Sequence, residues 1–205
     1  MKKLLIATSN PGKLDEIKRF LAGIPIRAVS LSEAGLKADA PEDGNTFTEN
    51  AVMKAKYYAS GSGLPVLADD GGLEIDALGG EPGIKSHRWV HGNHESTDEE
   101  LISYTLKRLT GIPDHQRGAQ LHLVMVFARP EGYIRTSECL VRGIIPGKPS
   151  DRRTAGFPYR SLLYIPEICK FYDQSIMTDA ETERYNHRAK AVRKLIPYIR
   201  KELGV

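Results

Sequence analysis

Residues 4–13, which read Leu-Leu-Ile-Ala-Thr-Ser-Asn-Pro-Gly-Lys, decide the fold class of this chain. The apolar run at 4–7 has the length of a buried strand, and the polar residues after it are typical of a turn. The next apolar residues have helical spacing: Leu14, Ile17, Phe20 and Leu21. Another apolar run follows at 25–29. A strand, a loop, a helix and a second strand in this order favour an α/β sheet.

The rest of the chain continues this alternation of helical and extended patterns. It predicts helices over 46–59, 97–109 and 183–203, and strands over 25–29, 65–68, 73–76, 120–128 and 133–145. Between two of the strands, the sequence Asp69-Asp70-Gly71-Gly72 predicts a chain reversal, because glycine pairs are typical of turns.

Length and composition indicate one globular domain over residues 1–205. The formal net charge is only +3, which gives little support to a dedicated nucleic-acid-binding protein. No apolar run approaches the roughly 20 residues that a membrane span needs. We therefore expect a cytoplasmic protein with neither a nucleic-acid nor a membrane partner.

The loop after the first strand is a candidate phosphate site. Ser9, Asn10 and Lys13 lie between the strand and the helix, where free backbone N–H groups and the helix dipole attract anions. Gly12 would let the backbone approach a ligand closely. The spacing is not that of a Walker loop, so an ordinary strand–helix connection remains an alternative.

Acidic residues beside loops are candidate magnesium ligands. Asp69 and Asp70 follow a buried strand, and Glu42 lies in an earlier loop. Carboxylate oxygens are ligands that Mg²⁺ prefers. Adjacent residues of a regular strand point to opposite faces, so both aspartates serve one site only if the chain turns there. A solvated acidic turn remains the alternative.

Basic residues could complement these acids. Lys54 lies in the predicted helix over 46–59, and the pair His187-Arg188 lies in the last helix. Each could equally be a plain solvated charge. Three further histidines, at 87, 91 and 94, share no defined face, so we expect a surface loop there and not a zinc site.

Four blocks of sequence together resemble one known family, the Ham1 or ITPase-like nucleoside-triphosphate pyrophosphatases that clear inosine and xanthosine triphosphates. The first block is Thr8–Lys13 with Glu16, and the second is EDGNTFTENAVMK at 42–54. The third, LADDGGLEIDALGGEPGIKSHR at 67–88, is highly specific. The fourth combines Gly156-Phe157 with His187-Arg188-Ala189. The resemblance spans nearly the whole chain.

The resemblance implies a two-lobed α/β fold with a twisted mixed sheet and a cleft between the lobes. It also implies a homodimer that uses Mg²⁺ to hydrolyse a nucleoside triphosphate to the monophosphate and pyrophosphate. Asp70 would be the general base or water-positioning acid, and Glu42, Asp69 and Asp70 would hold the metal. Carried over residue by residue, the substrate-binding set is Thr8, Ser9, Asn10, Lys13, Lys54, Gly71, Phe157, Tyr159, Arg160, His187 and Arg188.

Departures from the family pattern gather in the part that recognises the base. Gly71 replaces a serine, and Arg160 stands where the family has an acid. Thr182 and Asn186 replace a lysine and a serine. We therefore expect an altered base preference, for a nonstandard or modified nucleotide. If Arg160 instead points to solvent, the base pocket is unchanged.

Two other functions remain open from the sequence. A nucleotide-binding pseudoenzyme or sensor could keep the fold without turnover, although the four residues Glu42, Lys54, Asp69 and Asp70 argue against a lost activity. A nucleic-acid-binding protein could use the basic run 184–201, although apolar residues in that run predict that it packs against the core.

Overall fold

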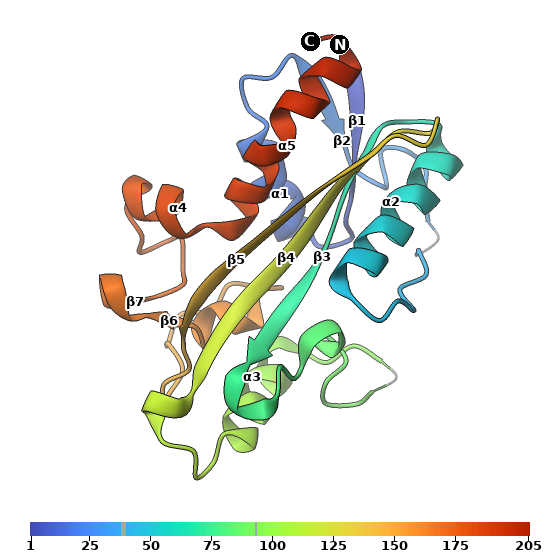
Figure 1. Ribbon diagram of the computed structural model, residues 1–205. Coiled ribbons are helices and arrows are strands. Elements are labelled where there is room, and N and C mark those ends of the chain that lie inside the picture. The colour runs from blue at the N-terminus through green and yellow to red at the C-terminus, as the bar shows by residue number, and fades with distance from the viewer. Residues whose placement is uncertain (38–39, 93) are drawn as a thin grey trace. The chain divides into compact units, whose positions relative to one another are not determined.

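The computed structural model describes residues 1–37, 40–92 and 94–205. Seven strands form one twisted sheet in the order β2-β1-β3-β4-β5-β6-β7 (Figure 1). They are β1 (Lys2–Ala7), β2 (Ile26–Val29), β3 (Val66–Ile75), β4 (Gly118–Ala128), β5 (Ile134–Ile144), β6 (Tyr164–Ile165) and β7 (Lys170–Phe171). β1 is parallel to β2 and β3, whereas β6 is antiparallel to β5 and β7. The predicted α/β class with a mixed sheet is therefore confirmed.

The α-helices are α1 (Pro11–Phe20), α2 (Phe47–Ser62), α3 (Asp98–Arg108), α4 (Asp179–Tyr185) and α5 (His187–Leu203). The helices predicted over 46–59 and 97–109 correspond to α2 and α3. The single helix predicted over 183–203 is wrong, because Asn186 separates α4 from α5. Asn186 is fully buried and has an extended backbone with ψ 99°, which ends α4.

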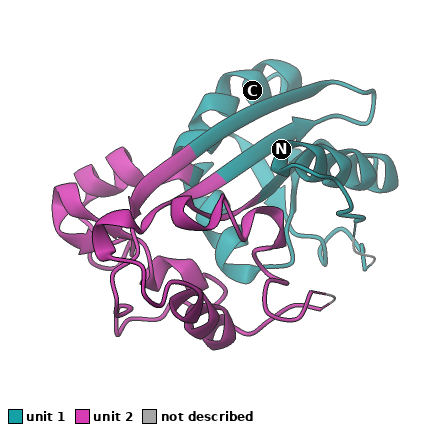
Figure 2. Cartoon of the chain, turned by 60° about the horizontal axis from the view of Figure 1, so that its bottom comes forward, with its two compact units in different colours: residues 1–70, 123–139, 188–205 teal, residues 71–122, 140–187 magenta. Residues whose placement is uncertain are grey.

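The described residues form two compact units, shown in two colours in Figure 2. Unit 1 comprises Met1–Asp70, Leu123–Cys139 and Arg188–Val205, and unit 2 comprises Gly71–His122 and Leu140–His187. The strands β3, β4 and β5 each contribute residues to both units. No described helix has both the length and the apolar character needed to cross a membrane.

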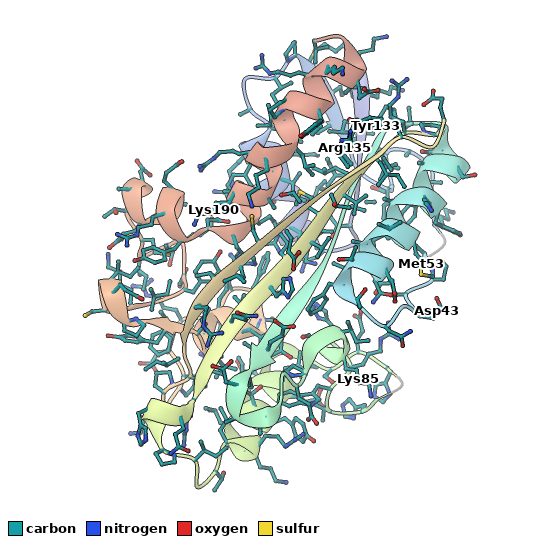
Figure 3. All side chains as sticks on the ribbon, viewed as in Figure 1. Asp43, Met53, Lys85, Tyr133, Arg135 and Lys190 are labelled. Carbon is teal, nitrogen blue, oxygen red and sulfur yellow. The ribbon has the colours of Figure 1, made fainter. Side chains whose placement is uncertain are left out.

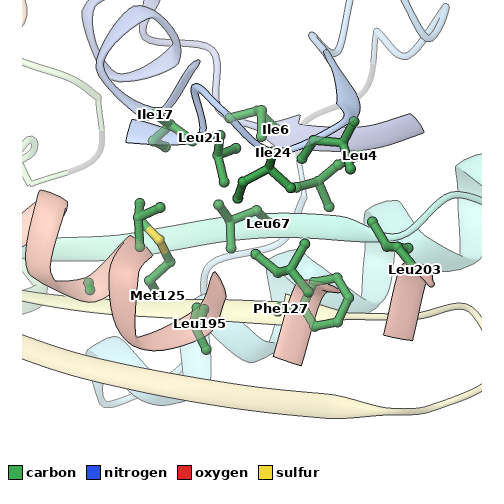
Figure 4. Packing of buried hydrophobic residues seen from close by; sticks show 14 of the residues in the cluster. Leu4, Ile6, Ile17, Leu21, Ile24, Leu67, Met125, Phe127, Leu195 and Leu203 are labelled. Carbon is green, nitrogen blue, oxygen red and sulfur yellow. The ribbon is translucent and has the colours of Figure 1, made fainter. Parts of the chain in front are cut away.

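Unit 1 has helices on both faces of its strands, because successive strand residues point to opposite sides. One core cluster joins alternate residues of β1, β3 and β4 to α1 and α5, and Figure 4 shows this packing. The intervening residues form a second cluster with α2. The apolar positions of α5 are buried, as predicted: Ala189, Val192, Leu195 and Ile199.

The chain reversal predicted at 69–72 is wrong, because β3 runs without a break from Val66 to Ile75. The glycine at position 72 serves close packing. A Cβ there would lie 2.0 Å from Ser86 Oγ and 2.7 Å from Gly83 O. Ser86 Oγ also accepts a hydrogen bond from Leu73 N at 3.0 Å and donates one to Gly83 O. A tertiary contact thus explains a residue that looks like a turn signal.

Unit 2 packs around α3, the second halves of β3 and β5, and the first half of β4. Its core cluster includes Leu73, Leu101, Ala119 and Val141. The helix α3 begins with a capping box, in which Thr97 and Glu100 each satisfy a backbone N–H of the other. This is the N-terminus that the sequence predicts.

Candidate active site

The topology of unit 1 indicates where its site lies. β1 is flanked by β2 and β3 in parallel, and the connecting helices α1 and α2 pack on opposite faces of the sheet. In such sheets, ligands bind outside the carboxyl ends of the strands where the order reverses. Here that point is the carboxyl end of β1 beside β3, whose last paired residues are Ala7 and Ala68. The loop after β1 begins immediately after Ala7, and Asp69 and Asp70 directly follow Ala68 within β3.

The loop after β1 is a helix N-terminus, as predicted. Asn10 caps α1, with its Oδ1 accepting a hydrogen bond from Lys13 N at 3.1 Å. Asn10 N donates to Thr8 Oγ1 at 3.2 Å, which fixes the turn. A pocket of about 340 Å³ borders the same loop and is lined in part by Thr8, Ser9 and Asn10. The loop therefore presents hydroxyls and a helix N-terminus that suit an anionic ligand.

Asp69 lies on the face of β3 that is covered by α1 and α5. Its side chain is 1% exposed, and its Oδ2 lies 3.1 Å from Lys13 Nζ and 3.7 Å from Arg188 Nη2. Burial alone would raise the pKa of this carboxyl, but Lys13, Arg188 and Lys54 outweigh burial and hold the pKa well below its usual range. Asp69 is therefore ionised and neutralised by two cations.

Asp70 lies on the opposite face, towards α2. Its Oδ2 is buried and has no hydrogen-bond partner among the described residues. Burial raises the pKa of Asp70, the nearby Glu42 carboxylate raises it further, and Lys54 and Lys13 only partly offset this. A carboxylate with an unused oxygen and a raised pKa is suited to accept a proton.

Glu42 and Lys54 lie beside Asp70. Lys54 Nζ forms an ion pair with Glu42 Oε1 and donates to the main-chain oxygen of Asp69 at 3.3 Å. Burial would lower the pKa of Lys54, but the carboxylates of Glu42, Asp69 and Asp70 raise it overall. The structure thus brings the side chains of Glu42, Lys54 and Asp70 together within unit 1, whereas the Asp69 carboxylate lies on the other face of β3.

Sequence reasoning missed the role of Asn50. This side chain is 3% exposed, and its Oδ1 accepts a hydrogen bond from Gly44 N at 2.8 Å. A further hydrogen bond from Asn50 to Asp70 lowers the pKa of that carboxyl. Asn50 therefore connects the loop of Glu42 to Asp70. Its position four residues before Lys54, on the same helical face, is the signal that could have identified it.

Glu16, which accompanies the first sequence block, is a second residue whose role the sequence did not predict. Its Oε2 accepts a hydrogen bond from Arg188 Nη1 at 2.9 Å, and both side chains are at most 6% exposed. This pair fixes the guanidinium that also faces Asp69. The two residues are 172 positions apart in the chain, so no local sequence pattern could predict that they form a buried pair.

The donor set fits a magnesium ion only in part. Among residues 1–37, 40–92 and 94–205, no group of three His, Cys, Asp or Glu side chains is placed to hold a metal. Mg²⁺, however, usually keeps several waters and binds one or two carboxylates together with substrate phosphates. Asp70, with its unused oxygen, and Glu42 fit that pattern, whereas the Asp69 carboxylate faces Lys13 and Arg188.

The residues expected to recognise the base belong to unit 2. Arg160 is 6% exposed, and its guanidinium carbon lies 3.7 Å from the centroid of the Phe157 ring. The alternative that Arg160 points to solvent is therefore wrong. Tyr159 is packed in the core of unit 2 and donates its hydroxyl to Ser86 O at 2.6 Å. Burial raises the pKa of this hydroxyl above its ordinary value.

Two further predicted residues adjoin the boundary between the units. His187, the last residue of unit 2, has its Nδ1 2.9 Å from the Tyr172 hydroxyl. Gly71, the first residue of unit 2 after Asp70, lies within β3. The predicted cleft between two lobes stays a prediction.

The site of unit 1 has groups of the kinds that suit a hydrolase acting on phosphoric anhydride bonds: a helix N-terminus, two lysines and a buried carboxylate with a raised pKa. Comparison with known proteins agrees with this class. The model of the Ham1 family matches residues 4–198, and the chain belongs to the Ham1 family.

Individual relatives are similar along nearly their whole length. The dITP/XTP pyrophosphatase of Thermus thermophilus is 41% identical over 95% of this chain and 90% of its own. The dITP/XTP pyrophosphatase of Yersinia pestis is 36% identical over 98% of this chain. A HAM1 protein from Coxiella burnetii has a TM-score of 0.83 at 30% identity, covering 98% of this chain and 100% of its own. The predicted enzyme class, nucleoside-triphosphate pyrophosphatase, is thereby confirmed.

Proposed function

We propose that the protein hydrolyses a nonstandard or modified nucleoside triphosphate to the nucleoside monophosphate and pyrophosphate. The observation that carries this proposal is Asp70, whose buried Oδ2 has no hydrogen-bond partner among the described residues and whose pKa is raised. A group that takes a proton from water needs both properties. A pseudoenzyme would have no need to maintain such a carboxylate.

The residues of the unit 1 site have two kinds of role, binding the phosphates and accepting the proton of the attacking water. Lys13 and Lys54 neutralise the phosphate oxygens, and the N-terminus of α1 with Thr8, Ser9 and Asn10 supplies hydrogen bonds to them. Asp70 orients the attacking water and accepts its proton. Asp69 acts through Lys13 and Arg188, whose positions it holds. Phosphoryl chemistry depends mainly on such positioning and charge neutralisation.

Mg²⁺ belongs to this proposal as the cofactor. Glu42 and Asp70 are its best-placed protein ligands, with phosphate oxygens and water completing the shell. The Asp69 ligand implied by family resemblance stays a prediction, because its carboxylate already has two cationic neighbours. When bound, the ion neutralises charge that develops on the phosphate oxygens.

The test of this proposal is the replacement Asp70→Asn, which keeps the shape but removes the base. We expect turnover to fall by about 100-fold or more, the scale of general-base loss. Pyrophosphate release with Mg²⁺ is the measurement, and circular dichroism checks the fold. The exposed Asp15→Asn on α1 is the matched control and should keep full activity. Full activity in a folded Asp70→Asn variant would contradict the role of Asp70.

Base preference is the second part of the proposal. Arg160 places hydrogen-bond donors against Phe157, and the ring of Phe157 offers a surface for stacking. Arg160 also lies over the Tyr172 ring, and the Tyr172 hydroxyl lies 2.9 Å from His187 Nδ1. Thr182 stands in place of the family lysine, and Gly71 in place of its serine. The relatives are named dITP/XTP pyrophosphatases. Arg160 supplies hydrogen-bond donors where the family has an acid, which accepts, so the site should favour a different edge of the base.

We expect catalytic efficiency to be poor with inosine triphosphate and higher with another, modified nucleotide. A site built around hydrogen bonds discriminates by roughly 10⁴ against a ligand that leaves buried groups unpaired. The measurement is kcat/KM for inosine, xanthosine, standard and modified nucleoside triphosphates. The Arg160→Asp variant, which restores the acid of the family, should move the preference back. A clear preference of the unmodified protein for inosine or xanthosine would show that Arg160 does not contact the base.

We propose further that the protein acts as a cytoplasmic homodimer, in agreement with the family resemblance. Light scattering during size-exclusion chromatography tests the dimer. A monomer at micromolar concentration would contradict it.

A further inference from the structure

The acidic part of the site already contains a positive charge. The Lys54 ammonium lies against Glu42 Oε1, and it donates to the main-chain oxygen of Asp69 at 3.3 Å. The Asp70 carboxylate is close enough to act on the same ammonium electrostatically. Two carboxylates and a main-chain carbonyl are the oxygen donors that a hard divalent cation uses. Lys54 thus has the surroundings of a metal ion.

The oxygen atoms around Lys54 are held by the fold. Gly44 N donates to Asn50 Oδ1 at 2.8 Å, and Asn45 N donates to Glu49 Oε2 at 2.6 Å, so the loop after Glu42 is tied to the first turns of α2. A Cβ at Gly44 would lie 2.7 Å from Glu49 Cβ, which shows how closely they pack. In Figure 3 this loop, marked by Asp43, lies beside Met53 of α2.

Lys54 itself can move without any change in the backbone. Its side chain is 16% exposed, and four rotatable methylene groups separate the ammonium from α2. Asp69 Oδ2, by contrast, lies on the other face of β3 with its own lysine, Lys13, at 3.1 Å. Lys54 is therefore the cation that the Glu42 and Asp70 side of the site could release.

We propose that the Lys54 ammonium occupies the divalent-cation position in the nucleotide-free protein, and that metal binding displaces it towards the phosphates. The inference rests on the proposed Mg²⁺ dependence for its biological meaning. One lysine then serves two states. Without metal it keeps Glu42 and Asp70 from repelling each other, and with metal it becomes available to the triphosphate. The protein should accordingly bind metal weakly until nucleotide gives Lys54 another partner.

The first experiment measures Mn²⁺ binding to the nucleotide-free protein by electron paramagnetic resonance, since Mn²⁺ accepts the same oxygen ligands. Lys54→Met should bind Mn²⁺ about ten-fold more tightly than the unmodified chain, the change that ~1.4 kcal/mol of competition produces. Lys13→Met removes an equal charge on the other face of β3 and should change the affinity much less. Lys56→Met, exposed on the same helix, should change nothing.

The second experiment uses the unmodified chain and so does not depend on how a variant folds. Limited acetylation followed by peptide mapping should modify Lys54 faster with saturating Mg²⁺ than without it, while Lys56 reacts equally in both. Displacement is wrong if Lys54→Met binds Mn²⁺ no more tightly, if Lys13→Met gains as much, if no Mn²⁺ binds, or if acetylation of Lys54 is unchanged. Pyrophosphate release by the unmodified chain is measured separately, so a failed displacement leaves the proposed function intact.

Discussion

Asp69 and Asp70 are adjacent in the chain but have opposite environments. Asp69 faces α1 and α5 with two cations, and Asp70 faces α2 with an unused oxygen. The pKa of Asp69 is lowered by its cations, whereas burial raises that of Asp70. On β3, the ionised form of Asp69 therefore stabilises the fold, whereas the ionised form of Asp70 destabilises it.

The pH dependence of stability should separate these two carboxylates. The lowered pKa of Asp69 means that its stabilisation is complete above the ordinary value of 3.8 and is lost as the pH falls below it. Asp69→Asn should lower the free energy of unfolding at pH 7 by about 3 kcal/mol, because a buried ion pair is broken. The difference from the unmodified chain should shrink below pH 4.

Asp70→Asn should behave in the opposite way. Because the pKa of Asp70 is raised in the folded chain, its ionised form destabilises the fold as the pH rises through that pKa. The variant should thus be at least as stable as the unmodified chain at pH 7, and the gain should disappear towards pH 4. Urea unfolding in metal-free buffer measures both variants. Equal losses of stability at pH 7 would show that the two aspartates share one environment.

At the scale of elements, β3 shows why a turn signal can mislead. Two consecutive glycines are typical of a reversal, yet β3 continues through them. Gly72 is small because Ser86 and Gly83 approach the strand. No local pattern contains this information, since the contact lies 14 residues further along the chain. The break between α4 and α5 at Asn186 has a similar origin. Asn186 is neither a proline nor a glycine, but its side chain is buried.

Identical substitutions at two glycines should therefore have opposite effects. Gly72→Ala should destabilise the protein by about 1–3 kcal/mol, because the new Cβ overlaps Ser86 Oγ and Gly83 O. Gly61→Ala in α2, where a Cβ meets nothing within 4 Å, should stabilise by about 0.5–1 kcal/mol through helix propensity. Thermal unfolding measures both. A stabilising Gly72→Ala would mean that β3 and the 83–86 turn do not pack as described.

The sequence predicted the elements of the site better than their geometry. The loop after β1, the helix α2 and the acidic pair follow from local patterns and from the resemblance to a family. Which face each aspartate occupies depends on the strand continuing past Asp70. The buried Glu16–Arg188 pair depends on α5 packing beside α1. Both facts are tertiary, so periodicity and spacing could not supply them.

At the scale of the whole molecule, the question is whether the two units unfold together. We expect one transition, because β3, β4 and β5 each lose part of their length when either unit unfolds. The chain supplies a probe for each unit. Trp89, the one tryptophan, reports on unit 2, and the buried thiol of Cys139 reports on unit 1.

Urea unfolding of a Cys169→Ser variant, which removes the exposed thiol, makes this measurable. Trp89 fluorescence and pulsed thiol labelling of Cys139 should give the same midpoint, as expected of one cooperative domain. Midpoints that differ beyond error would contradict the single domain predicted over 1–205.

The path of the chain between the units also bears on how genes of this family can be recombined. The polypeptide passes from one unit to the other at 70/71, 122/123, 139/140 and 187/188. A single exchange between two parental genes therefore cannot transplant either unit whole. A segment taken from one parent must extend to the boundary at 70/71 if it is to carry Asp70 together with the loop after β1. A chimera that takes unit 2 from one parent, for its base preference, and unit 1 from the other, for its catalytic residues, needs a breakpoint at each of the four boundaries.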